Sequence, residues 1–189
     1  MNNGDWAKPM KTAAKLRKEN IAEYLLYMWQ MEDLLRACRC DMEVVKSQLL
    51  HNFPEADRKE EEQWMQELCD MMHREAVTEH GHLQINKNVL QELTELHNVL
   101  LASPKFPYYS AAYYNALPFI VELRAKAGAE AAPEIDTCFQ ALYGELMLRL
   151  KKQPVSEGTQ EAMQTIKRFI AMLAAYYTDE KEGKFDVDC

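Results

Sequence analysis

Residues 20–36, NIAEYLLYMWQMEDLLR, decide the fold that the sequence predicts. The stretch contains no glycine, proline or serine, and apolar side chains cover almost the whole circumference of a helical wheel. A helix that is apolar on nearly every side has to be enclosed by other helices. We therefore expect it to belong to the central, first helix of a bundle.

Glu32 is the exception in this stretch. On the wheel it projects into the middle of a side formed by four apolar residues, Ile21, Leu25, Met28 and Leu35. A buried, unpaired carboxylate is costly, so Glu32 should be paired with Arg36 one helical turn on, ligated or protonated. Glu145 and Arg149 repeat the same spacing later in the chain. We expect structural salt bridges, with a polar ligand site inside the bundle as the alternative.

The remaining sequence predicts helices and no strands, because no segment alternates apolar and polar residues with a period of two. The expected helices cover approximately residues 10–38, 42–53, 55–80, 86–102, 104–128, 133–152 and 157–180. Asp41 and Ser156 are suitable N-caps. Pro118 should kink or divide the helix that contains it. Five apolar residues form the stripe of the fourth helix: Ile85, Val89, Leu93, Leu96 and Leu100.

The prediction is an all-α protein, a single-domain bundle of six to seven helices around a central hydrophobic first helix. Residues 1–9 are expected to be a disordered leader, residues 10–180 the helical bundle domain, and residues 181–189 a frayed tail. A length of 189 residues and a hydrophobic content of 48% suit one domain with a sizeable core.

Charge and composition argue against several partners and compartments. A net charge of −8 makes nucleic acid an unlikely partner and disfavours anionic membranes, although a basic patch around Lys11 could form an interaction arm instead of an exposed helix start. No apolar run could span a bilayer and no secretory signal is visible, which predicts no membrane association and a cytoplasmic location. Five irregularly spaced cysteines are expected to be reduced.

No catalytic residues, cofactors or metal ligands are predicted. The six glycines are scattered singly, so no phosphate loop or dinucleotide fingerprint exists, and none of the four serines lies in a nucleophile elbow. The turn at His80, Gly81 and His82 is interpreted as polar, not as a ligand set. His97 borders an apolar stripe and is expected to be buried or half-buried and hydrogen-bonded to a neighbour.

Tyrosines crowd one segment of the chain: Tyr108, Tyr109, Tyr113 and Tyr114. They can pack between helices as core residues or line a pocket or an interface. The alternative ligand site would combine both pairs of charged residues with two of these tyrosines: Glu32, Arg36, Tyr109, Tyr113, Glu145 and Arg149.

Three segments resemble a family of uncharacterised helical proteins from the Bacteroidetes: LRKENIAEYLLYMWQMEDLLRA, EIDTCFQALYGELMLRLKK and FIAMLAAYYTDEKEGKF. The resemblance covers residues 16–185 and implies an all-helical single domain. Because the family is known as a domain of unknown function, it implies no activity and no site residues. Such proteins tend to begin close to their first helix, which motivates the hypothesis that Met10 is the natural start.

Together these observations predict a non-enzymatic helical binding or interaction protein, acting as a homo-oligomer or with a protein partner. Eleven methionines and nine tyrosines suit adaptable contact surfaces. The alternative is a protein or enzyme that binds an unknown small molecule at the polar site around Glu32 and Arg36.

Overall fold

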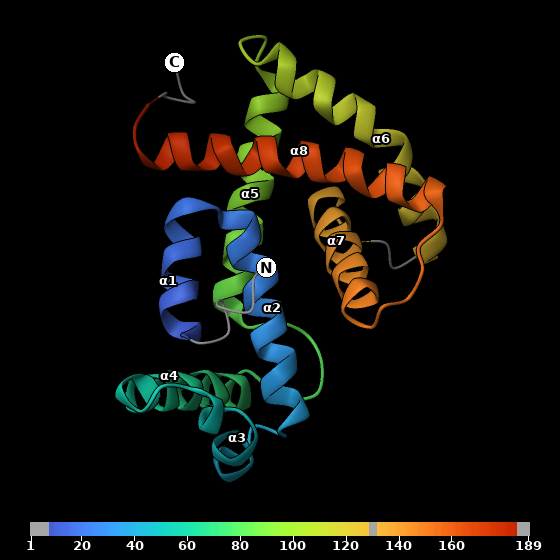
Figure 1. The fold of residues 1–189 in the computed structure, drawn as a ribbon. Coiled ribbons are helices and arrows are strands. Elements are labelled where there is room, and N and C mark those ends of the chain that lie inside the picture. The colour runs from blue at the N-terminus through green and yellow to red at the C-terminus, as the bar shows by residue number, and fades with distance from the viewer. Residues whose placement is uncertain (1–7, 129–131, 185–189) are drawn as a thin grey trace. The chain divides into compact units, whose positions relative to one another are not determined.

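The computed structural model describes residues 8–128 and 132–184, and every regular element in these ranges is a helix (Figure 1). The all-α prediction is therefore confirmed. The described ranges contain eight α-helices and one short 3₁₀-helix, more than the six to seven helices expected.

Backbone contacts divide the chain into two compact units, residues 1–89 and 90–189. One domain over residues 10–180 stays a prediction, and residues 1–7 of the expected leader and 185–189 of the expected tail lie outside the described ranges.

The described part of the first unit consists of five complete helical elements and the first residues of a sixth. They are α1 (Pro9–Glu19), α2 (Ile21–Ala37), α3 (Met42–Gln48), η1 (Leu50–Asn52), α4 (Glu55–Arg74) and the first residues of α5 (Gln84–Ala102). Helix α2 contacts both α1 and α4. Most of the side chains of α2 are buried, Trp29 and Tyr27 among them, and they lie on nearly every side of the helix, as the apolar wheel predicted.

The predicted continuous helix over residues 10–38 is wrong, because the chain breaks at Asn20. This residue has an extended backbone, with φ −155° and ψ 96°, and it ends α1 and begins α2. Its side-chain oxygen accepts hydrogen bonds from the backbone N–H groups of Ala22 and Glu23, each at 3.2 Å. Asparagine is a preferred N-cap, so this side chain supplies the partners that a new helix start requires.

Helix α1 is attached to α4 by charged groups. Lys8 and Lys11 lie 3.0 and 2.7 Å from the two carboxylate oxygens of Asp57. The backbone N–H of Met10 donates to Glu61 at 2.8 Å. The pKa of the Glu61 carboxyl is raised, mainly by burial. Part of the basic patch noted in the sequence thus pairs with acidic residues of its own chain.

The second unit contains the remainder of α5 and three long helices. They are α6 (Pro107–Ala127), α7 (Glu134–Leu150) and α8 (Glu157–Lys181). Helix α6 packs on α7 and on α8, and α7 also packs on α8. Phe139 and Phe169 are fully buried in this unit. The Ser156 hydroxyl accepts the backbone N–H of Thr159, which confirms the predicted cap.

Pro118 does not divide α6, which continues as one helix on both sides of it. A proline removes one backbone hydrogen bond, and the carbonyl left without a donor belongs to the residue four positions earlier, Tyr114. Both residues are exposed, so water can satisfy that carbonyl. Division of the helix at Pro118 was therefore a wrong prediction, and a kink there stays a prediction.

Candidate functional site

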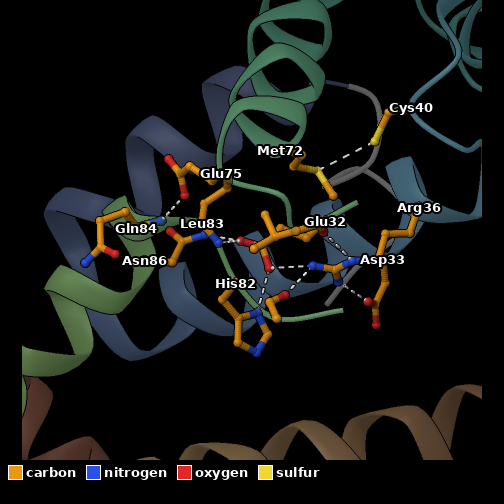
Figure 2. Close-up of polar contacts among 12 residues, drawn as sticks. Glu32, Asp33, Arg36, Cys40, Met72, Glu75, His82, Leu83, Gln84 and Asn86 are labelled. Carbon is orange, nitrogen blue, oxygen red and sulfur yellow. Dashed lines mark hydrogen bonds and ion pairs between the residues drawn. The ribbon is translucent and has the colours of Figure 1, made fainter. Parts of the chain in front are cut away.

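Glu32 lies at the centre of a polar cluster in the first unit (Figure 2), and its side chain is 1% exposed. Its Oε1 accepts the backbone N–H of Leu83 at 3.0 Å and the side-chain amide of Asn86 at 2.7 Å. Its Oε2 lies 2.6 Å from Nδ1 of His82 and 3.7 Å from the Arg36 guanidinium. Both oxygens of the carboxylate therefore have partners. We call these five residues the Glu32 clasp.

Arg36 connects α2 to the segment between α4 and α5, residues 75–83. Its Nε donates to the backbone carbonyl of Val77 at 3.2 Å, and its Nη2 donates to the carbonyl of Gly81. Its Nη1 donates to Asp33 at 2.7 Å. The expected pairing with Glu32 is present, but the hydrogen bonds of the guanidinium go to Asp33 and to this connecting segment.

His82 is held by a ring stack and a hydrogen bond. Its imidazole lies parallel to the Trp29 indole, with ring centroids 4.1 Å apart and an interplanar angle of 11°. Because a carboxylate can only accept, Nδ1 carries the hydrogen in the contact with Glu32. The sequence interpretation treated His82 as part of a polar turn and missed this role. A buried carboxylate needs hydrogen-bond donors, and this requirement was the sign in the sequence that could have identified His82 as a partner of Glu32.

Two carboxylates accept hydrogen bonds from the backbone N–H groups at the start of α5. The first N–H groups of a helix have no partner within it, and negative charge is favourable at that end. Glu32 accepts from Leu83, and Glu75 accepts from the N–H of Gln84 at 2.6 Å. The clasp therefore caps α5 and attaches the connecting segment to α2, which is a structural task.

Asn86 is buried at the start of α5, where the sequence pattern predicted that its apolar neighbour Ile85 would be buried. It is 1% exposed, whereas Ile85, assigned to the buried stripe, is 37% exposed. The other four stripe residues are buried, as predicted. The side-chain nitrogen of Asn86 donates to Glu32, and its Oδ1 is buried without a hydrogen-bond partner. The first turn of α5 is thus oriented by the carboxylate.

Tyr109 and Tyr113 lie in the second unit and are buried, at 0% and 7% exposure. The Tyr109 hydroxyl is 2.7 Å from Nδ1 of His97, and the Tyr113 hydroxyl donates to Glu134 at 2.8 Å. Burial lowers the pKa of His97 and raises the pKa of Tyr113 to about 12. The Phe169 ring packs against both tyrosines. These tyrosines are core residues, and His97 is buried and hydrogen-bonded as expected.

Glu145 and Arg149 also form their expected contact, at 3.0 Å, in the second unit. Lys167 of α8 lies closer to the same carboxylate, at 2.6 Å. The side chain of Arg149 is 68% exposed and that of Glu145 is 12% exposed. Arg149 therefore lies at the surface, and the contact between Glu145 and Lys167 links α7 to α8. Of the six predicted site residues, Glu32 and Arg36 belong to the first unit and the other four to the second, so their combination in one site stays a prediction.

The cysteines of the described ranges are free and buried: Cys38, Cys40, Cys69 and Cys138. Arg39 and Cys40 have left-handed backbones, with φ 57° and 50°, in the turn that follows α2. The Cys40 sulfur lies 3.9 Å from the sulfur of Met72. Burial raises the pKa of Cys69 to about 12, and such a thiol is poorly reactive. Across residues 8–128 and 132–184, no three His, Cys, Asp or Glu residues gather closely enough to hold a metal ion.

The first two-thirds of α6 carries an unusual surface. Residues 107–121, PYYSAAYYNALPFIV, contain no charged residue, although 28% of the chain is charged. Their exposed members define the outer face of α6: Pro107, Tyr108, Ala111, Tyr114, Asn115, Pro118 and Val121. Tyr108, Tyr114 and Val121 are 80%, 60% and 54% exposed. The tyrosine segment therefore divides into two core residues and two surface residues.

Comparisons with known proteins give one match. No curated protein and no solved structure matches the chain. None of the helices in the described ranges combines the length and the apolar character needed to cross a membrane. A family model described as "Domain of unknown function (DUF4924)" matches residues 10–184, nearly the whole chain. The chain therefore belongs to this family, whose function is unknown.

Proposed function

We propose that the chain is a non-enzymatic interaction protein and that the outer face of α6 is its contact surface. The observation that carries the proposal is the exposure of seven neighbouring residues, none of them charged, on a chain of net charge −8. Exposed apolar patches on otherwise polar proteins mark interaction sites. Tyrosine is enriched at such contacts, since its ring is large and rigid and its hydroxyl tolerates water.

The Glu32 clasp supports a structural role more than a ligand site. All the partners of its carboxylate come from the chain itself, so neither oxygen is left to recognise a small molecule. Tyr109 and Tyr113, which the alternative proposal uses as pocket residues, are packed in the core of the second unit. These contacts favour an interaction surface elsewhere on the molecule.

Photo-cross-linking in the native cells tests the proposal. A benzophenone amino acid would replace Tyr108 or Tyr114, and in a control it would replace Gln164, an exposed residue of α8. We expect protein adducts from positions 108 and 114 and few from position 164. The proposal fails if the two α6 positions give no adduct, or give no more than the control.

A further inference from the structure

We infer that the partner at the outer face of α6 is a second copy of this chain, with the two α6 helices antiparallel and centred on Tyr114. This inference rests on the proposed function and specifies its partner. It follows from the charge of the chain, from the length of the uncharged run and from the order of the charged residues that follow it.

Charge argues for an uncharged partner surface. A basic partner would be attracted most strongly to the acidic remainder of the chain, not to the uncharged outer face of α6. A charged group of any partner that packed on the outer face would lose its water and find no opposite charge there. Two copies that each carry a net charge of −8 repel each other, and this repulsion costs least where neither surface presents charge. The outer face of α6 meets this requirement in both copies at once, as a two-fold interface demands.

The register follows from the ends of the uncharged run. Residues 107–121 extend about 21 Å along a helix, and Tyr114 is their middle residue. An antiparallel pair centred there brings Pro107 of one copy level with Val121 of the other. The charged residues Glu122, Arg124 and Lys126 then lie beyond the ends of the shared apolar surface.

A parallel pair would be less favourable. It would place Glu122 beside Glu122 and Arg124 beside Arg124 of the second copy, so like charges would face each other. It would also align the two helix dipoles, which an antiparallel pair opposes. The antiparallel arrangement avoids both costs.

The size of the surface predicts a weak dimer. Tyr108 and Tyr114 are the large residues of the outer face, and aromatic side chains bury about 150–250 Å² each when fully enclosed. The two tyrosines together contribute at most about 300–500 Å², and even with five smaller neighbours the face does not exceed the roughly 800 Å² per partner found in stable complexes. Self-association should therefore be reversible and should depend on concentration.

Light scattering and sedimentation of the purified full chain test the inference. We expect a monomer–dimer equilibrium that shifts to dimer between about 1 and 100 μM. Tyr114→Glu should reduce dimerisation at least tenfold, because two carboxylates would meet at the two-fold axis. Gln164→Glu adds the same charge to an exposed site on α8 and should dimerise like the unaltered chain. Circular dichroism checks that both variants keep their helix content.

Cross-linking between engineered cysteines tests the orientation. In a Cys189→Ser background, Tyr108→Cys and Val121→Cys chains would be mixed and treated with a short bismaleimide. We expect the mixed pair to cross-link more than either chain with itself. Preferential 108–108 and 121–121 products would overturn the antiparallel arrangement.

The outcomes separate the two proposals. A strictly monomeric chain, or a Tyr114→Glu variant that dimerises like the unaltered chain, overturns the inference. If benzophenone at positions 108 and 114 then still gives adducts with a different protein, the proposed function stands without the dimer. If those positions give no adducts, both proposals fail.

Discussion

The two Glu–Arg pairs look alike in the sequence and differ in the structure. Glu32 and Arg36, like Glu145 and Arg149, are four residues apart on an apolar helix. The Glu32 side chain is 1% exposed and its oxygens bind groups from the start of α5. The Arg149 side chain is 68% exposed, and Lys167 is the nearer partner of Glu145.

The difference teaches that spacing alone says little about the contribution of an ion pair. A buried carboxylate loses its water and depends on every donor the protein supplies, so losing part of the arrangement is expensive. The Glu145 side chain is 12% exposed, but Arg149 is mostly in water, where salt screens its charge, so their contact contributes at most about 1 kcal/mol. The two pairs therefore make a matched test within one chain.

Glu32→Ala should have the largest effect. It leaves the Leu83 N–H, the Asn86 amide and the His82 ring without their acceptor, and we expect a loss of about 3–5 kcal/mol in the free energy of unfolding, measured with urea. Glu32→Gln keeps one acceptor oxygen and should cost about 1–2 kcal/mol. A loss below about 1 kcal/mol for the alanine variant would contradict the structural role of the clasp.

Arg36→Ala should have an intermediate effect. Its removal takes away the donors to the Val77 and Gly81 carbonyls, so we expect a loss of about 2 kcal/mol. Amide hydrogen exchange should become faster in residues 75–83. Equal acceleration throughout the first unit, with no preference for this segment, would show that Arg36 does not act through the connecting segment.

Changes to the second pair should be small. Arg149→Ala should cost about 0–0.5 kcal/mol, since the guanidinium is mostly in water. Glu145→Ala should cost about 1 kcal/mol, because it also removes the contact with Lys167.

A double-mutant cycle should give a coupling energy for residues 32 and 36 that exceeds the one for residues 145 and 149. Equal couplings would remove the distinction between the pairs.

The burial of Glu32 could be predicted, but its partners could not. The helical wheel placed the carboxylate on an apolar side because that placement depends only on residues within one helix. His82, Leu83 and Asn86 lie about 50 positions further along the chain. The turn after α4, where Ala76 and Gly81 have positive φ, brings them back to α2. Such a return path has no periodic signature in the sequence.

The continuous helix across Asn20 and the division of the helix at Pro118 were both wrong, for opposite reasons. Asn20 ends α1 although the apolar pattern continues across it, because a capping side chain stabilises a new start there. Pro118 does not end α6 although proline usually breaks helices; Tyr114 and Pro118 are both exposed, so water can satisfy the carbonyl that loses its donor. In both cases the hydrogen bonds available to a few backbone groups decided whether the helix continued.

The sequence by itself determined the helical class, most helix positions, the burial of residues 20–36 and the absence of charge along residues 107–121. These properties follow from neighbours within one helix, so periodicity and composition reveal them. Only the tertiary structure decided which carboxylate became a structural clasp, which tyrosines entered the core and which remained exposed on α6. Those outcomes depend on contacts between distant residues, where desolvation and hydrogen-bond supply are set by the packing of other helices.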